Sequence, residues 1–151
     1  MGGAFVGLAD DANATYWNPA GLAQVARPSA TWMHTMTNRD EINYQDYLAF
    51  TTPAGVNGII GISWIGFKMG IASDVADEQD WYWLSAATRV NPDTSFGMNI
   101  RSIDSSLGGF DTEIGFAVSF LTRLNDQWSL GLLVQNVNEP EMSIDDIPIA
   151  E

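Results

Sequence analysis

Acidic side chains dominate the chemistry that this 151-residue chain could perform, because nineteen Asp and Glu residues stand against six Lys and Arg and give a formal charge of −13. Asp10 and Asp11 are adjacent and could act as a catalytic carboxylate pair. Acid–base or nucleophilic catalysis would need a partner such as histidine, an activated serine or lysine, and none lies nearby in the sequence. Because aspartate is also a common helix N-cap, we expect Asp10 or Asp11 to cap a short helix.

Two other groups of residues could bind a metal ion. His34 is the only histidine and the chain has no cysteine, so neither a multi-histidine site nor a thiolate site is available. Asp74, Asp77, Glu78 and Asp80 could offer oxygen ligands to a divalent cation, but their spacing does not fit a calcium-binding loop. The sequence therefore favours a solvated acidic loop, and we predict no metal, no cofactor, no catalytic residue and no enzyme activity.

The elements that carry these residues alternate apolar side chains with small or polar ones. In the segment 110–121 (FDTEIGFAVSFL), Ile, Phe, Val and Phe fall on one face, whereas Glu, Gly, Ala and Ser fall on the other. This period of two is typical of β-strands. Seven segments of this kind predict an all-β fold of seven antiparallel strands; they span 29–37, 43–51, 58–66, 81–89, 94–102, 110–121 and 128–136.

The links between these segments differ in length on the two sides of the predicted sheet. Short turns are expected at 52–57, 91–93 and 125–127, and long links at 68–80 and 103–111, beside a brief link at 38–41. This alternation is typical of an up-and-down barrel with one tight and one elaborate rim. Acidic residues concentrate on the elaborate rim: Asp40, Glu41, Asp74, Asp77, Glu78, Asp80, Asp104 and Asp111.

The two strand faces distinguish a membrane barrel from a soluble one. A water-facing strand surface is normally rich in charged residues, but here the second face is mostly Gly, Ala, Ser and Asn. Small and polar residues suit a barrel lumen, so the sequence predicts a transmembrane β-barrel, with a soluble β-barrel that binds an apolar ligand as the alternative. Aromatic residues near the strand ends predict two interfacial belts. One comprises Tyr44, Tyr47, Trp64, Trp81 and Trp83, and the other Phe50, Phe96, Phe120 and Trp128.

The first 28 residues predict a helical segment in front of the strands. Asn18 is a favourable N-cap and Pro19 suits a first helical position, so 20–25 should form a second short helix after the one that the aspartates cap. Two such helices would lie inside or under the barrel. The predicted organisation is a hatch (1–28), about seven barrel strands (29–138) and an acidic loop (139–151) at which the chain is truncated.

The sequence GGAFVGLADDANATYWNPAGLAQV resembles the N-terminal signature of the FadL-type outer-membrane barrel superfamily, especially its PorV/PorQ-like and related uncharacterised branches. A glycine-rich start, an acidic pair with alanine and an aromatic-Asn-Pro-Ala-Gly-Leu step carry this resemblance. The later GLLVQNVNEP looks like a strand of those branches that ends in an asparagine-containing motif. The hatch motif so defined contains Asp10, Asp11, Asn18, Pro19, Ala20 and Gly21.

The resemblance implies a bacterial outer-membrane barrel with its N-terminal segment folded into the lumen. FadL-type members pass hydrophobic molecules, whereas PorV-like members carry exported proteins with the type IX secretion machinery. Outer-membrane lipid and either hydrophobic small molecules or secretion-machinery proteins are therefore the expected partners. The resemblance also implies a signal peptide and further strands that this chain does not show, so we expect a fragment. The acidic charge disfavours nucleic acid as a partner.

One polar pair is expected inside the barrel. Arg101 and Glu113 lie on the small-residue face of two consecutive strands and flank the 103–111 link. An antiparallel hairpin could place them opposite one another, so we predict a lumen-side ion pair.

Overall fold

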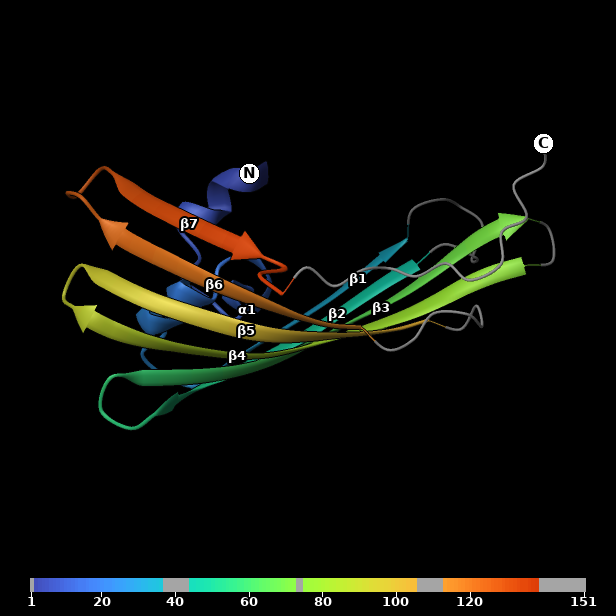
Figure 1. The fold of residues 1–151 in the computed structure, drawn as a ribbon, viewed down its shortest axis with the longest axis horizontal. Coiled ribbons are helices and arrows are strands. Elements are labelled where there is room, and N and C mark those ends of the chain that lie inside the picture. Colours follow the sequence, from blue (N-terminus) through green and yellow to red (C-terminus); the bar gives the residue numbers. More distant parts are fainter. Residues whose placement is uncertain (1, 37–43, 73–74, 106–112, 139–151) are drawn as a thin grey trace.

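The chain forms one antiparallel sheet with a helical segment on one of its faces (Figure 1). The computed structural model describes residues 2–36, 44–72, 75–105 and 113–138. Each strand pairs with its neighbours in chain order, which confirms an all-β, up-and-down fold of seven strands. The strands are β1 (Ser29–Met36), β2 (Tyr44–Ala54), β3 (Gly58–Ala72), β4 (Val75–Asn91), β5 (Thr94–Ser105), β6 (Glu113–Arg123) and β7 (Ser129–Gln135).

The sheet is open within the described residues. β1 pairs only with β2, and β7 pairs only with β6, so these two strands form its edges. The three short turns lie where the sequence predicts them, after β2, β4 and β6. The described residues thus form an open up-and-down antiparallel sheet that does not close into a ring.

The prediction of a long link at 68–80 is wrong, because most of this segment is strand. β3 continues to Ala72 and β4 begins at Val75, with Lys68 opposite Glu78 in the register. An ion pair between these two side chains supports the extended hairpin, as opposite charges do on facing strands. Asp77, Glu78 and Asp80 therefore belong to β4. The link expected at 103–111 also needs a correction, because β5 continues to Ser105 and includes Asp104. The link 38–41, the remainder 106–111 and Asp74 lie outside the described residues.

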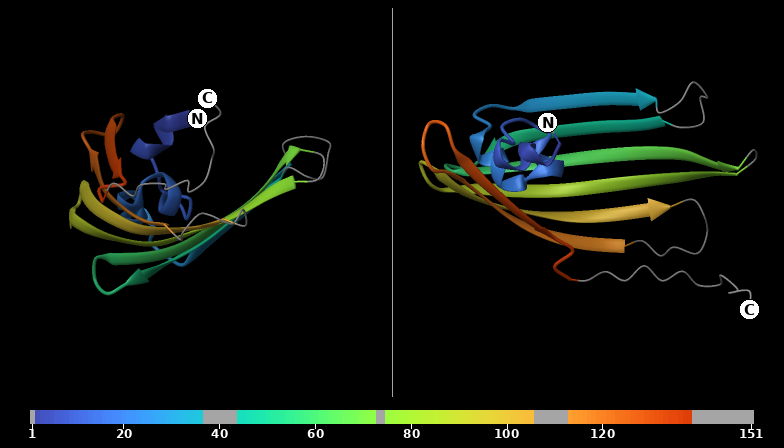
Figure 2. Two further views of the ribbon diagram at one scale, coloured as in Figure 1. Left: turned by 45° about the vertical axis from the view of Figure 1, so that its right-hand side comes forward. Right: turned by 90° about the horizontal axis from the view of Figure 1, so that it is seen from above.

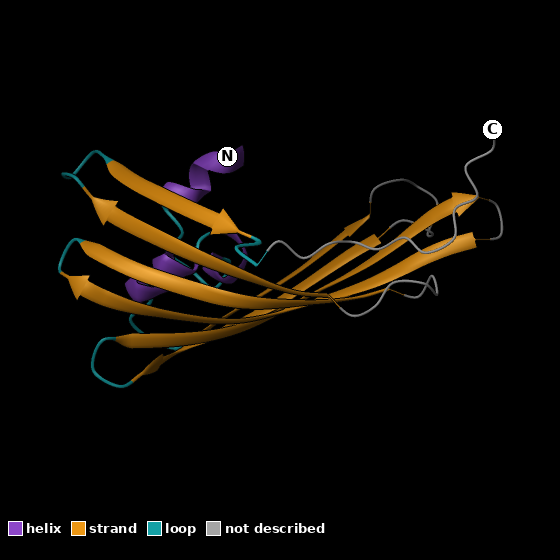
Figure 3. Ribbon diagram, viewed as in Figure 1, coloured by secondary structure: helices purple, strands orange, loops and turns teal. Residues whose placement is uncertain are grey.

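The N-terminal hatch consists of three short helical pieces. They are η1 (Gly2–Gly7), α1 (Ala14–Trp17) and η2 (Pro19–Gln24), and Figure 3 shows all of them on one side of the sheet. Figure 2 shows the sheet curving around them at the end that carries the short turns. We call the side of the sheet that holds the hatch the inner face and the opposite side the outer face. A first helix was expected at 12–14, but the structure forms it two residues later.

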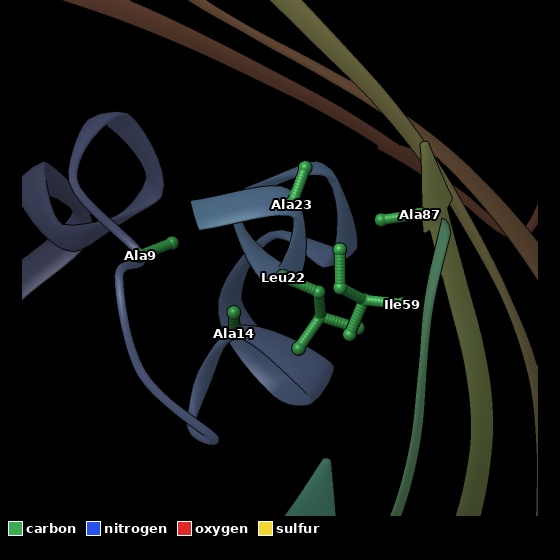
Figure 4. Close-up of a cluster of buried hydrophobic side chains, with 6 residues drawn as sticks. All are labelled: Ala9, Ala14, Leu22, Ala23, Ile59 and Ala87. Atoms are coloured by element: carbon green, nitrogen blue, oxygen red, sulfur yellow. The ribbon is translucent and has the colours of Figure 1, made fainter. Parts of the chain in front are cut away.

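Two apolar clusters join the hatch to the inner face. In the first, the side chain of Leu22 points toward Ile59 on β3, and Ala23 lies near Ala87 on β4 (Figure 4). In the second, Ala12 packs with Tyr47 and further residues of β2, β3 and β4. Burying a leucine fully contributes about 1.5–3 kcal/mol, so these clusters hold the hatch against the sheet.

Much of the inner face is small or polar, with Ile103 and Leu121 as further buried apolar residues, whereas the outer face is mainly apolar. The buried polar residues of the sheet all face the hatch: Thr51, Ser63, Ser85, Ser95, Asn99 and Ser119. Large apolar side chains alternate with them and are exposed on the outer face, among them Leu48, Phe50, Ile60, Ile62, Leu84, Phe96, Met98, Ile100, Phe116, Val118, Phe120 and Leu132. This distribution is the reverse of the one that a soluble sheet shows.

Candidate functional site

The candidate site is the contact between the hatch and the inner face, and Asn18 lies at its centre. Its side chain is fully buried, and its Oδ1 accepts a hydrogen bond of 3.1 Å from the backbone N–H of Ala20. Its Nδ2 donates to the carbonyl oxygens of Val6 at 2.7 Å and Phe120 at 3.4 Å. One amide therefore caps η2, holds η1 and contacts β6. The predicted N-cap at Asn18 and the start of the helix at Pro19 are confirmed.

The adjacent aspartates act differently from each other. Asp11 accepts two hydrogen bonds of 2.8 Å, one from the backbone N–H of Asn13 and one from its Nδ2. These bonds fix the turn in front of α1, although the N-cap of that helix is Asn13 rather than either aspartate. Asp10 is exposed. The expected capping of a helix is therefore wrong in detail: Asp11 forms an Asx-type turn, which such side chains favour.

Side chains of three strands hold the backbone of η2. The Oγ of Ser119 on β6 accepts a hydrogen bond of 2.9 Å from the N–H of Ala20, and the Oγ of Ser95 on β5 donates one of 2.7 Å to its carbonyl. On β4, Arg89 donates from Nη2 to the carbonyl of Ala23 at 2.6 Å. A short helix leaves its terminal backbone groups without intrahelical partners. The polar inner face supplies those partners.

The helix α1 is held in the same way through Thr15. The Oγ1 of this residue donates to the carbonyl of Ala12 and lies 3.0 Å from the hydroxyl of Tyr47 on β2. Its carbonyl accepts hydrogen bonds from Ser85 at 3.5 Å and from Asn99 at 3.3 Å. The side chains of Ser85 and Asn99 on the inner face thus bind the hatch.

Two glycines on the inner face allow this close approach. A Cβ at Gly97 would lie 2.2 Å from the backbone nitrogen of Ala20, and a Cβ at Gly131 would lie 2.1 Å from the carbonyl oxygen of Val6. Within the hatch, Gly21 is equally close to the backbone of Ala9. Gly21 belongs to the hatch motif, whereas the sequence showed Gly97 and Gly131 only as small residues and nothing in it marked them as contact points.

Replacing Ser95 by alanine should weaken the hatch without releasing it. The substitution leaves the buried carbonyl of Ala20 without its donor, which typically costs about 1–3 kcal/mol. We expect a lower midpoint of urea unfolding for the protein in detergent, with an unchanged slope. Ser102 lies on the outer face of the same strand, so Ser102→Ala is a matched control that should leave the midpoint unchanged. Equal midpoints for the two variants would contradict the role of Ser95.

The predicted aromatic belts need a correction at the long-link end. Tyr47 and Trp83 are 5% and 4% exposed and, with the partly buried Trp81, they pack on the inner face. The reason is the period of two, since Trp81 and Trp83 flank the outward-facing Tyr82. Among the predicted belt residues, the strand register places Tyr44, Trp64, Phe96 and Phe120 on the outer face. The outer face also holds Trp32, which was not assigned to a belt from the sequence.

Trp128, the remaining predicted belt residue, lies directly before β7 at the short-turn end and is exposed. Phe50, in the same predicted belt, is on the outer face of β2. Both positions agree with the short-turn side that the sequence predicts for them. Their contact with a bilayer stays a prediction.

The predicted ion pair between Arg101 and Glu113 stays a prediction. The register places Glu113 opposite Ile103 and Arg101 opposite Gly115, so both residues belong to the inner face. Arg101 donates from Nη2 to the Oδ1 of Asn136 at 2.9 Å, and its guanidinium lies 5.3 Å from the ring centre of Trp81. The side chain of Glu113 lies outside the described part of the chain.

Two cavities lie beside the hatch. The one at the short-turn end has a volume of about 560 Å³ and a mostly polar lining that includes Arg89, Arg123 and Gln24. The other has a volume of about 460 Å³ and lies against α1. Apolar side chains form much of its lining: Phe5, Tyr16, Trp17, Met33, Tyr47 and Ile65.

The described residues contain no group of three or more histidine or acidic side chains that could hold a metal ion. No helix in the described ranges is long and apolar enough to cross a membrane. Comparison with known proteins found no family model, no curated protein and no solved structure that matches the chain.

Proposed function

We propose that the chain forms part of the wall and the hatch of a bacterial outer-membrane β-barrel that transports hydrophobic compounds. The observation that carries this proposal is the distribution of side chains on the two faces of the sheet. Large apolar residues are exposed on the outer face, and serine, threonine and asparagine are buried on the inner face. A bilayer selects this arrangement in a barrel, because lipid contacts the outside and polar groups must be satisfied inside.

The dimensions of the outer face support the same proposal. Asp104 lies in a polar row at one end of β5, and Thr94, which shares a hydrogen bond of 3.0 Å with Thr122, lies at the other. Between positions 94 and 104 there are ten residue steps, which span about 33 Å along a strand. At a strand tilt of about 40° this length covers about 25 Å, which is the height of the apolar band of membrane barrels.

Polar side chains mark the boundary of this band. His34 Nδ1 lies 2.7 Å from Asp46 Oδ1, and the indole nitrogen of Trp64 donates to Asp80 at 2.7 Å. Tryptophan at such a boundary has an apolar ring and a polar N–H, which suits a membrane–water interface. A soluble barrel would instead expose the whole apolar band to water, where such large patches promote association.

The cavity against α1 supports a hydrophobic cargo. Its volume of about 460 Å³ is typical of a small-molecule site, and aromatic side chains from the hatch and the sheet line it. The hatch occupies the inner face beside this cavity, where it would control passage. No comparable observation favours the alternative role in protein secretion.

A lysine at the centre of the band tests the proposal. Met98 is 51% exposed on the outer face, and Val56 is 98% exposed at the turn before β3. In a membrane barrel, Met98→Lys should destabilise the protein in lipid vesicles by about 2–4 kcal/mol, whereas Val56→Lys should have little effect. Urea unfolding, monitored by the heat-modifiable shift on a gel, measures the stability of both variants.

The two outcomes separate the proposal from its alternative. If the protein is soluble, both positions contact water and both lysines should be nearly neutral. Equal stability of the two variants, or a folded monomer of the wild type in buffer without detergent, would refute the membrane barrel. Transport is measured separately, as uptake of a fluorescent hydrophobic compound into vesicles that contain the protein.

A further inference from the structure

A shallow groove crosses the outer face where the apolar band meets its polar boundary. Its volume is about 440 Å³, and four adjacent strands, β2 to β5, form it. The register shows that its side chains belong to two neighbouring cross-strand rows. Most of the lining is apolar and comprises Leu48, Phe50, Ile62, Trp64, Leu84 and Ile100.

The position of the Trp64 ring explains why the groove is open. Its indole N–H donates to Asp80 Oδ1 at 2.7 Å, which draws the ring toward the polar boundary and away from the row of Ile62. The ring can lie there only because residue 66 is glycine, since a Cβ at Gly66 would be 2.6 Å from Cζ2 of the indole. At the β5 end, Ser102 is too small to close the space.

We propose that this groove binds one acyl chain of a membrane lipid whose head group carries an ammonium. The inference rests on the proposed function, because the groove is continuous with the outer face that would contact lipid. Three adjacent strands give it a length of about 10 Å between their axes, and the fourth extends it to about 14 Å. An extended hydrocarbon chain fits a shallow apolar groove of this length better than a globular partner does.

The charges along the polar side of the groove favour a cationic head group. Asp46, Gly66, Asp80 and Asp104 follow one another across β2 to β5 in a single row. Asp80 and Asp104 are directly opposite each other, and such like-charge pairs destabilise a sheet. An ammonium placed above them would relieve this repulsion, whereas an anionic head group would add to it.

Two cations of the described residues lie near this row, and both are already engaged. His34 contacts Asp46, and Lys68 contacts Glu78, so both are paired within the sheet. The row therefore presents net negative charge to the head group region. Phosphatidylethanolamine provides the required ammonium, and phosphatidylglycerol with the same acyl chains provides the matched anionic comparison.

Native mass spectrometry of the protein released from nanodiscs tests the proposal. The nanodiscs contain equal amounts of phosphatidylethanolamine and phosphatidylglycerol with identical acyl chains. The wild type should retain one lipid and prefer the ammonium head group by about fivefold. This factor matches the electrostatic free energy of one unit charge near a membrane surface. Asp104→Asn should retain the lipid but reduce this preference.

Two variants close the groove and one serves as a control. Gly66→Ala should push the indole back into the groove, and Ser102→Trp should fill its open end, so both should reduce lipid retention about fivefold or more, an effect of about 1 kcal/mol. Val118→Phe changes the same outer face away from the groove and should retain lipid like the wild type. Should Gly66→Ala fail to fold, Ser102→Trp still decides the question.

The outcomes distinguish this inference from the proposed function. Wild type that enters nanodiscs but retains no lipid, or retains both head groups equally, refutes the lipid site and leaves the membrane barrel intact. Unchanged retention in both groove variants refutes it as well. Protein that does not enter nanodiscs at all refutes both proposals.

Discussion

Replacing Gly97 by valine should release the hatch from the inner face and, in the proposed barrel, open the lumen. A Cβ at this position would lie 2.2 Å from the nitrogen of Ala20 and 2.4 Å from the carbonyl carbon of Pro19, and neither backbone atom can move independently of η2. The hatch must then move away, which breaks the hydrogen bonds that Ser95 and Ser119 make with Ala20. We expect a loss of about 3 kcal/mol or more in the free energy of unfolding.

Limited proteolysis and solute leakage measure this release. The segment 1–25 of Gly97→Val should be cleaved while the strands stay protected, and vesicles that contain the variant should leak a small solute faster than those with wild type. A Cβ at Gly3 would have no atom within 4 Å, so Gly3→Ala is the matched control and should behave like wild type. A protected N-terminal segment in Gly97→Val would contradict the docking described above.

Substituting Asn18 by aspartate should destabilise the hatch strongly and in a pH-dependent way. The new carboxylate keeps the acceptor for Ala20 but replaces the Nδ2 that donates to Val6 and Phe120. A buried charge then faces two carbonyl oxygens, and leaving such a charge uncompensated costs about 3–5 kcal/mol. When the pH falls and the carboxyl becomes protonated, it regains an O–H donor and loses its charge, so stability should recover toward acid pH.

The comparison with Asn18→Ala separates the destabilisation caused by the buried charge from the destabilisation caused by the lost hydrogen bonds. Alanine removes the cap and leaves the carbonyl of Val6 without this donor, at a cost of about 2 kcal/mol. That loss should not vary with pH, because alanine does not titrate. Urea unfolding at several pH values, followed by tryptophan fluorescence, measures both variants relative to wild type. A pH-independent difference between the aspartate and alanine variants would contradict this account.

The sequence predicts the strands well because their hydrophobic period is strong. In β5 and β6, large apolar residues alternate with small ones over the central part of each strand, and both strands form close to where they are expected. The pattern stops at the polar residues 77–80, so the sequence does not predict the continuation of β4 into this region. What supports that continuation is the pairing of Lys68 with Glu78 across the hairpin, which depends on register rather than composition.

The sequence predicts less of the site. Asn18 and Pro19 could be assigned from capping preferences, because these depend on neighbouring residues alone. The role of Gly97 depends on a hatch residue more than seventy positions away, and no local pattern reports such a contact. Tyr47 and Trp83 were assigned to a belt from their position along the strand, whereas the structure shows that the face to which they belong decides their contacts.

The direction of the two edge strands restricts how this sheet can close. Because every neighbouring pair is antiparallel, β1 and β7, the first and last of seven strands, run in the same direction. Joining them directly, or joining two copies of the sheet by rotation about a common axis, would create parallel contacts between edges. A ring that is antiparallel throughout therefore needs an odd number of additional strands between β7 and β1. This requirement follows from the odd number of strands in the sheet, and it holds whichever chain supplies the additional strands.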